Sequence, residues 1–474
     1  MSRQRFIVTD TSWAPDLSQF PGPKYLSLNR ALREAIRNGD LPPSAQLPTV
    51  RDLAWRLHLT PGTVARAYQL ATQEGLLAAT VGRGTFVAAQ APRLGPTQAL
   101  YTERLTGGTT GLVDLRPPQV AEVGQREAFR AALLAMAETT GQGWLDYTSQ
   151  GGEAELRTEI VGWMGDRLLG PIGPQDVALT HGGQNAIHLI FDCCLRGERP
   201  VVLIEELAYP GFRYAARAAR AEVVPVEIDE QGVVPEALEA ACRRHGAQVL
   251  CLTSEAQNPT TGRMPVERRQ KIAEIARRYD LQVLEDDCYS VAESDIPSLR
   301  ALAPERVWLV GSLSKTISAA LRFGYVICPA GMGEAGRLTA QHGFFALSRP
   351  VADLCLHLFQ SGAAAAIKRK VQAEFAERLQ ILVNHIGAFD LDWQPGVPFV
   401  WLRLPMGWRA STFTRMAEAR GVLVRSADEY ALINGRAPSA VRIAISGSLP
   451  RDAFERALRT LADLLANPPS DLSV

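Results

Sequence analysis

Val310-Gly-Ser-Leu-Ser-Lys-Thr-Ile-Ser-Ala-Ala-Leu-Arg-Phe-Gly-Tyr325 is the segment around which the rest of this sequence can be arranged. An apolar run rich in β-branched residues leads into it and breaks at Gly311. The chain then presents Ser312, Ser314 and Lys315 before a predicted helical pattern, and Arg322 and a second apolar run follow. The pattern predicts a lysine at the carboxyl end of a strand, with hydroxyls and an arginine close by.

Apolar, strand-like runs surround this segment, and helical patterns such as 186–194, 235–244 and 268–279 separate most of them. The predicted strands are 177–180, 201–204, 222–226, 249–253, 282–285, 307–310 and 324–328. Alternation of this kind predicts an α/β domain with a largely parallel sheet. In such sheets ligands bind beyond the carboxyl ends of the strands.

Composition limits the class of protein. At 474 residues, with 46% apolar and 21% charged residues, the chain is long enough for two or three globular domains. The formal net charge is zero, but residues 1–90 hold ten Lys and Arg against six acidic residues, so the basic character lies at the N-terminus. The seven cysteines show neither Cys-x-x-Cys nor metal-ligand spacing, and no apolar run is long enough to span a bilayer. These features predict a reduced, cytoplasmic protein without a metal.

The first ninety residues predict three helices and a hairpin. Residues 24–38 have helical apolar spacing, Thr49 caps a second helix, and Thr60 caps a third. Two short strands then flank Gly82-Arg83-Gly84. This order is typical of a winged helix-turn-helix that binds the DNA major groove. A generic small helical domain is the alternative.

Polar motifs follow the predicted strands of the larger region. They are Thr180-His181-Gly182-Gly183-Gln184, Tyr209-Pro210-Gly211, Asn258-Pro259-Thr260-Thr261-Gly262 and Glu285-Asp286-Asp287-Cys288-Tyr289. A lysine amine can form a Schiff base with an aldehyde cofactor, while hydroxyls, an arginine and a glycine turn bind the phosphate of that cofactor. Each motif alone is equally consistent with a turn or a carboxylate cluster, and the fold alone could serve a nucleotide.

Taken in this order, the motifs from about residue 114 to 474 resemble the fold-type I aminotransferases. The resemblance implies pyridoxal 5′-phosphate (PLP) as cofactor, with Lys315 as the Schiff-base residue and Asp286 on the pyridine nitrogen. It also implies a set of further contacts: Tyr289 and Asn258 to the phenolic oxygen, Tyr209 to the ring, and Gly183, Gln184, Ser312, Ser314 and Arg322 to the phosphate. Tyr147 matches a tyrosine that reaches the phosphate of the partner subunit, which implies a homodimer. Arg442 matches the arginine that binds a substrate carboxylate.

The N-terminal region has its own resemblance. Leu47-Pro48-Thr49-x-Arg51-x-Leu53-Ala54, Thr63-Val64-x-x-Ala67-Tyr68, Glu74-Gly75 and Gly82-x-Gly84-Thr85-Phe86-Val87 resemble the DNA-binding domain of the GntR family over residues 24–87. The resemblance implies double-stranded DNA as a partner. The implied contacts come from Arg51, Thr60, Thr63, Arg66 and the hairpin with Arg83.

Together the two regions resemble the MocR subfamily of bacterial transcriptional regulators. The expected organisation is a winged helix-turn-helix over 1–88, a linker over 89–113, and an aminotransferase-like domain over 114–474. Within that domain the large part is expected at about 150–345 and the small part mainly at 346–474. The implied function is a PLP-dependent regulator that senses an amino acid, an amine or PLP itself. A working aminotransferase with a fused DNA-binding head remains an alternative, and a mere dimerisation scaffold is disfavoured because the cofactor motifs are intact.

Overall fold

The chain divides into two units, Met1–Thr102 and Glu103–Val474, which are considered separately. The computed structural model describes residues 12–20, 22–42, 44–74, 76–80, 84–88, 112–139, 144–147, 152–289, 292–432 and 437–468. Most of the predicted linker lies outside these ranges, so the expected domain limits stay a prediction. Within the same ranges, no helix combines the length and the apolar character that a bilayer span requires.

Among its described residues, the first unit has the three α-helices and the two-stranded sheet that the sequence predicts, preceded by the 3-10 helix η1 (Leu17–Gln19). They are α1 (Lys24–Asn38), α2 (Val50–Arg56), α3 (Pro61–Gln73), β1 (Leu77–Thr80) and β2 (Gly84–Val87). Thr49 accepts a hydrogen bond from the Asp52 N–H at 3.2 Å, and Gly39 ends α1 in the left-handed region. The predicted helix boundaries and caps are therefore confirmed, whereas the hairpin tip with Arg83 lies outside the described residues.

The second unit is built on a mixed sheet with strand order β4-β12-β11-β10-β9-β5-β6. The strands are β4 (Val177–Thr180), β5 (Val201–Glu205), β6 (Glu222–Val226), β9 (Val249–Leu252), β10 (Gln282–Asp286), β11 (Val307–Ser312) and β12 (Gly324–Ile327). Every predicted run forms one of these strands. Only β12 runs antiparallel to its neighbours in this sheet, so the other strands end at the edge where β12 begins.

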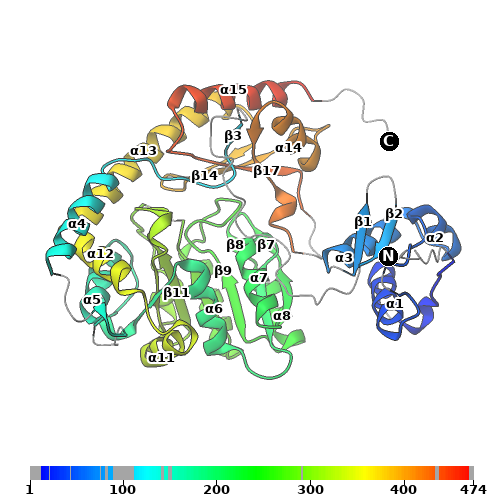
Figure 1. Ribbon diagram of the computed structural model, residues 1–474, viewed down its shortest axis with the longest axis horizontal. Helices are drawn as coiled ribbons and strands as arrows, with labels where there is room; N and C mark the ends of the chain where they lie inside the picture. Colours follow the sequence, from blue (N-terminus) through cyan, green and yellow to red (C-terminus); the bar gives the residue numbers. More distant parts are fainter. Residues whose placement is uncertain are drawn as a thin grey trace, which may run out of the picture. The chain divides into compact units, whose positions relative to one another are not determined.

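Helices and smaller sheets surround the large sheet (Figure 1). The helices are α4 (Gln125–Thr139), α5 (Ala154–Trp163), α6 (Gly183–Cys194), α7 (Pro210–Ala218), α8 (Pro235–His245), α9 (Val266–Arg278), α10 (Leu299–Leu302), α11 (Gly333–Phe344), α12 (Arg349–Gln360), α13 (Ala363–Ile386), α14 (Ala410–Ala419) and α15 (Arg451–Ala466). The small sheet is a separate antiparallel sheet with the order β13 (Leu391–Asp392), β14 (Phe399–Arg403), β17 (Ala440–Ala444), β16 (Arg425–Ser426). Two further pairs are β3 (Val113–Asp114) with β15 (Val422–Leu423), and β7 (Ile228–Asp229) with β8 (Gly232–Val233).

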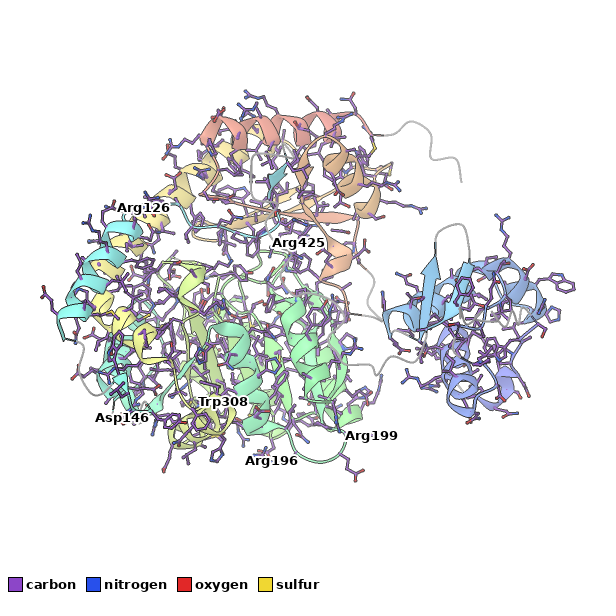
Figure 2. The ribbon with its side chains drawn as sticks, viewed as in Figure 1. Arg126, Asp146, Arg196, Arg199, Trp308 and Arg425 are labelled. Carbon is purple, nitrogen blue, oxygen red and sulfur yellow. The ribbon has the colours of Figure 1, made fainter. Side chains whose placement is uncertain are left out.

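Helices cover both faces of the large sheet. Leu203 and Leu250 pack with α8 and α9, whereas their neighbours Ile204 and Cys251 pack with α6 and α7. Trp308 on β11, labelled in Figure 2, is fully buried in this second layer. Burial on both faces explains why these strands are continuous apolar runs in the sequence.

The segment after Lys315 is not the helix that the sequence pattern predicts. Residues 313–318 form turns, and only the 3-10 helix η5 (Ala319–Leu321) precedes Arg322. Because β11 and β12 are adjacent and antiparallel, the chain must reverse direction within this short connection. Thr316 and Ile317 are β-branched, which also lowers helix propensity.

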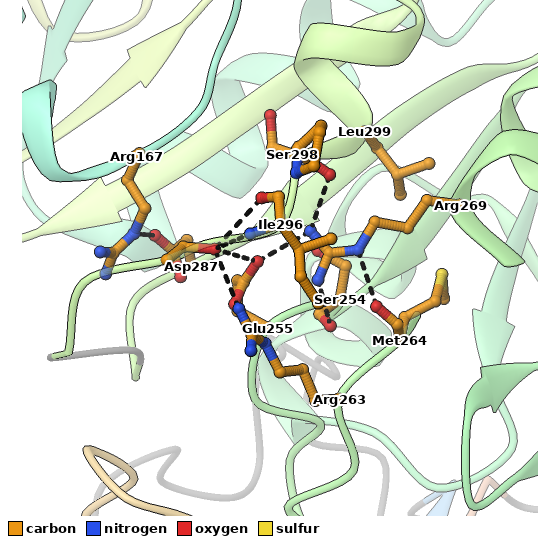
Figure 3. Close-up of polar contacts among 12 residues, drawn as sticks. Arg167, Ser254, Glu255, Arg263, Met264, Arg269, Asp287, Ile296, Ser298 and Leu299 are labelled. Atoms are coloured by element: carbon orange, nitrogen blue, oxygen red, sulfur yellow. Dashed lines mark hydrogen bonds and ion pairs between the residues drawn. The ribbon is translucent and has the colours of Figure 1, made fainter. Parts of the chain in front are cut away.

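A buried charged network fixes the loop that follows β9 (Figure 3). Arg269 on α9 is fully buried, and its guanidinium donates to Glu255 Oε1 at 2.7 Å, to the Met264 carbonyl at 2.9 Å and to the Ser254 carbonyl at 3.1 Å. Ser294 Oγ also donates to Glu255, at 2.8 Å. Because a buried charge is tolerated only with partners, this network holds residues 254–264 at the edge of the sheet.

We expect Arg269→Met to lower the free energy of unfolding of the second unit by about 3–5 kcal/mol, because the buried Glu255 loses its fully buried cation and keeps only the partly exposed Arg263 as an ionic partner. Arg277→Met is the matched control on the same helix. Arg277 pairs with Glu305 at 2.7 Å, but both side chains are nearly half exposed. Loss of that pair should cost at most about 1 kcal/mol. Urea denaturation followed by tryptophan fluorescence measures both variants, and equal losses would contradict the stabilising role of Arg269.

Candidate ligand site at the carboxyl ends of the strands

Lys315 lies in the turn directly after β11. Its Nζ donates to the Pro118 carbonyl at 3.1 Å and lies 5.7 Å from the centre of the Tyr289 ring. Burial, followed by the charge of Arg442, lowers the pKa of Lys315 to about 8. A larger share of this amine is therefore neutral near pH 7 than of an exposed lysine, and only the neutral amine is a nucleophile.

Asp286 and Tyr289 follow from the end of β10. Asp286 is buried, and its Oδ1 accepts a hydrogen bond from the Cys288 N–H at 2.9 Å. Burial raises the pKa of Asp286. Tyr289 packs edge-on against Phe399, with ring centres 5.3 Å apart. A cationic group beside Asp286 would offset the free energy lost by burying its carboxylate.

Arg442 on β17 connects the small sheet to the loop after β9. Its Nη1 donates to Asn258 Oδ1 and its Nη2 to the Arg116 carbonyl, each at 2.7 Å. The guanidinium carbon lies 4.8 Å from the centre of the Phe399 ring. Among the described residues, neither Asn258 Nδ2 nor Arg442 Nε has a hydrogen-bond partner, although both atoms are buried. Asn258 Nδ2 and Arg442 Nε are therefore two buried donors on adjoining segments that are free to bind a ligand or an ordered water.

The turn after β4 presents backbone N–H groups at the start of α6. Gly182 has φ +85°, and a Cβ on it would lie 2.6 Å from Arg322 Nη2. A Cβ on Gly183 would lie 2.9 Å from Cys288 Sγ. Arg322 Nη2 also donates to the His181 carbonyl, at 3.3 Å. The close approach of these groups forms a cradle of N–H donors beside a guanidinium, which suits a phosphate.

The two serines predicted beside this cradle lie at the end of β11. Ser312 is buried and pairs in register with Gly324, which in turn pairs with Thr180 on β4. Ser314 is partly buried in the turn that follows. Both hydroxyl-bearing residues are thus on the same strand end as Lys315.

Gln184 and Tyr209 lie on neighbouring helix starts. Gln184 Nε2 donates to the Gly211 carbonyl at 3.1 Å, and Tyr209 directly precedes α7. Burial raises the pKa of Tyr209, and the nearby Tyr289 and Asp286 act in the same direction. Tyr209 is therefore within electrostatic reach of the β10 end, where the sequence predicts a flat ring to bind.

Tyr147 is separate from this group. Its side chain is 85% exposed and stacks on Phe345, with ring centres 5.4 Å apart. Figure 2 labels the adjacent Asp146 near the lower left of the unit, away from Arg425. The assignment of Tyr147 to the site of a partner subunit stays a prediction.

The predicted DNA contacts of the first unit lie on α2 and α3. Arg51 is exposed in the first turn of α2, and Thr60 caps α3 with its Oγ1 2.9 Å from Thr63 Oγ1. The guanidinium carbon of Arg66 lies 4.0 Å from the centre of the Tyr25 ring. Arg83 is outside the described residues, and the DNA roles of all these residues stay predictions.

Several site groups have no sequence signal. The Pro118 and Arg116 carbonyls come from an irregular segment, and Arg425 and Tyr430 come from a two-residue strand and the 3-10 helix η6 (Ala427–Glu429) that follows it. Cys288 could have been noticed, because it stands between Asp286 and Tyr289 in the sequence. The other groups reach the site only through tertiary folding.

Comparison with known proteins agrees with this geometry. Residues 117–461 match the family described as aminotransferase class I and II, and residues 24–87 match bacterial regulatory proteins of the gntR family. The HTH-type transcriptional regulator YdeF of Bacillus subtilis, which is uncharacterised, is 28% identical over 96% of this chain and 97% of its own. The HTH-type pyridoxine biosynthesis transcriptional regulator PdxR of Corynebacterium glutamicum is 28% identical over 79% of this chain and 80% of its own.

A solved structure shares the fold of the second unit. The α-aminoadipate aminotransferase LysN of Thermus thermophilus, complexed with N-(5′-phosphopyridoxyl)-L-leucine, superposes with a TM-score of 0.65 at 24% identity, covering 75% of this chain and 92% of LysN. Because the family match spans most of the chain and the gntR match covers the N-terminal helices and hairpin, the chain belongs to the aminotransferase class I and II family and carries a gntR-type helix-turn-helix domain, the combination of the MocR-type regulators.

Proposed function

We propose that this chain is a transcriptional regulator that binds PLP at the strand ends, senses an amino compound there, and contacts DNA through its first unit. The observation that carries the proposal is the partly buried amine of Lys315, hydrogen-bonded to the Pro118 carbonyl beside a phosphate cradle, in a chain that also has a gntR-type domain. A DNA-binding regulator of this type would work in the cytoplasm, where bacterial DNA lies.

The residues at the strand ends fit PLP. Lys315 would hold it covalently, Asp286 would hold the pyridine nitrogen protonated, and the unpartnered Asn258 Nδ2 would donate to the phenolic oxygen. The cradle of Gly183 and Arg322 would bind the phosphate, together with Gln184, Ser312 and Ser314, while Tyr289 and Tyr209 would contact the ring oxygen and the ring. When bound, PLP supplies an electrophilic carbon and an electron sink for amines.

Arg442 is the group that would bind an effector carboxylate. Two of its five donors are engaged, by Asn258 and by the Arg116 carbonyl, and the buried Nε has no partner within the described residues. Asn258 also faces the cofactor, and Arg442 belongs to the small sheet. An effector held by Arg442 would therefore stabilise one arrangement of the two sheets over another. A ligand can switch a protein only if it binds one conformation more tightly than the other.

The proposal includes a homodimer. Tyr147, Leu145 and Phe345 are respectively 85%, 84% and 67% exposed, and Phe345 adopts a φ of +68°, which is unusual for a side chain of this size. A surface of exposed aromatic and aliphatic side chains in one region is typical of an interface. A partner subunit would cover this surface and receive Tyr147 at its own site.

A working aminotransferase is the second candidate, because the fold is shared with aminotransferases such as LysN. The two functions use the same cofactor residues and differ in turnover. Release of a keto acid from an amino-acid panel, with a second keto acid present to take up the amino group and measured against the number of protein sites, distinguishes them. More than one equivalent released per site would favour the enzyme.

The pKa of Lys315 predicts how cofactor uptake depends on pH. Uptake requires the neutral amine, so the rate constant for PLP binding to the cofactor-free protein should rise about tenfold per pH unit below pH 8 and level off above it. Stopped-flow absorbance measures this rate, borohydride reduction verifies the covalent link, and Lys315→Ala should abolish that link. A rate that still rises about tenfold per unit between about pH 8 and pH 9 would show that the lysine keeps its ordinary pKa.

Arg442→Gln should weaken the response to α-amino acids by about tenfold to a hundredfold, because a charge-assisted, two-point contact with the carboxylate is lost. Simple amines without a carboxylate provide the internal comparison and should respond as they do with the wild-type protein. Titration of the cofactor absorbance measures both. A parallel loss for amines and amino acids would assign Arg442 a structural role instead.

Arg51→Ala should weaken binding to the operator by about 1–3 kcal/mol and relax specificity at one position, if its exposed guanidinium reads a base edge. Arg33→Ala removes the same charge from the same unit, but Arg33 pairs with Glu74 at 2.8 Å and serves as the matched control. Gel shifts with the intergenic DNA beside the gene, at several salt concentrations, measure both. If the wild-type protein binds this DNA no more tightly than random duplex DNA, the aminotransferase function is favoured instead.

A further inference from the structure

Arg425 lies directly opposite Arg442 in the small sheet. The two residues are register partners on the antiparallel strands β16 and β17. Directly paired residues project from the same face of a sheet, with their Cβ atoms about 4.5–5.5 Å apart. The side chains of Arg425 and Arg442 therefore extend from the same face of the sheet, the face on which Arg442 contacts Asn258.

Arg425 is also within electrostatic reach of the site. After burial, the charges of Arg442, Arg322 and Arg425 each contribute to lowering the pKa of Lys315. Burial raises the pKa of Tyr430, and Arg442 and Arg425 oppose this rise. The hydroxyl of Tyr430 is buried and has no hydrogen-bond partner among the described residues. This hydroxyl is a position next to two cations at which a ligand oxygen can accept a hydrogen bond.

The acidic groups near Arg425 do not saturate it. Glu429 accepts a hydrogen bond from Arg425 Nη1 at 2.5 Å, but Glu429 is 43% exposed and four residues away on a short 3-10 turn. The Arg425 side chain is only 18% exposed, and this pair uses one of the five N–H donors of its guanidinium. Asp114 is already held by Arg116, at 2.8 Å. Arg425 thus keeps further N–H donors for a ligand.

Like charges placed directly opposite each other destabilise a sheet unless an anion lies close to both. PLP would be served by Arg322 and the glycine turn, which leaves both Arg425 and Arg442 for the effector. We propose that Arg425 is a second anion contact, so that the effector is an amino acid with an additional acidic group on its side chain. This proposal rests on the proposed function and narrows its effector class to amino dicarboxylates and similar dianions.

The test compares ligands that differ by one negative charge. Glutarate and butyrate have no amino group and cannot react with PLP. Calorimetry on the PLP-loaded protein therefore measures only the binding of their carboxylates. The wild-type protein should prefer glutarate by about tenfold or more, and Arg425→Gln should reduce that ratio close to one. Arg425→Lys keeps the charge without the planar fork and should give an intermediate ratio. Glu429→Gln removes the competing carboxylate and should raise the ratio.

The same variants are then titrated with L-glutamate and L-glutamine, with cofactor absorbance as the readout. Arg425→Gln should weaken the response to glutamate by about tenfold while changing the response to glutamine far less. If glutamate and glutamine both react but Arg425→Gln affects them equally, the proposal is wrong and the proposed function stands. If the glutarate preference depends on Arg425 but no amino acid alters the absorbance, the second anion contact stands and the proposed sensing of amines fails.

Discussion

The position of β12 between β4 and β11 is the constraint on which the candidate site depends. Gly324 at the start of β12 pairs with Thr180 on one side and Ser312 on the other. A Cβ on Gly324 would lie 2.7 Å from the backbone of Gly182, so the strands reach this register only with glycine. Arg322, in the left-handed region at φ +46°, precedes this strand and turns its guanidinium to the Gly182 turn. Segments more than a hundred residues apart in sequence thus form a single phosphate cradle.

Electrostatics gives the site its chemical preference. Lys315, Arg322, Arg425 and Arg442 face it from several segments, whereas Asp286 is buried and bound by a backbone N–H, and Glu429 is exposed. Burial of cations costs free energy unless anions accompany them, and the lowered pKa of Lys315 is one consequence. A ligand set with several negative charges, such as a phosphate and one or more carboxylates, relieves this cost. Turnover is not required for that stabilisation, which is compatible with a sensor as well as with an enzyme.

The hydrogen bond from Arg442 to Asn258 links the small sheet to the large one, and the Arg269 network holds the segment that carries Asn258. A ligand that replaces Arg442 or Asn258 in this hydrogen bond would act on a loop that the Arg269 network already holds in place. Coupling between the site and DNA would then be reciprocal, so operator binding would also alter effector affinity. Both hydrogen bonds lie within the second unit.

The sequence by itself determined most of the secondary structure and the family of this protein, and it predicts the chemistry of the site. The apolar runs predict every strand of the large sheet, and Thr49 and Thr60 predict the starts of two helices of the first unit, because caps and burial act locally. Only the tertiary structure decided the strand order, the antiparallel direction of β12 and the turn after Lys315, since these depend on pairing between distant segments. Arg425, Tyr430 and the Pro118 carbonyl could not be predicted from the sequence, because their segments have no periodic pattern. They come close to Lys315 and Arg442 only when the two sheets pack together.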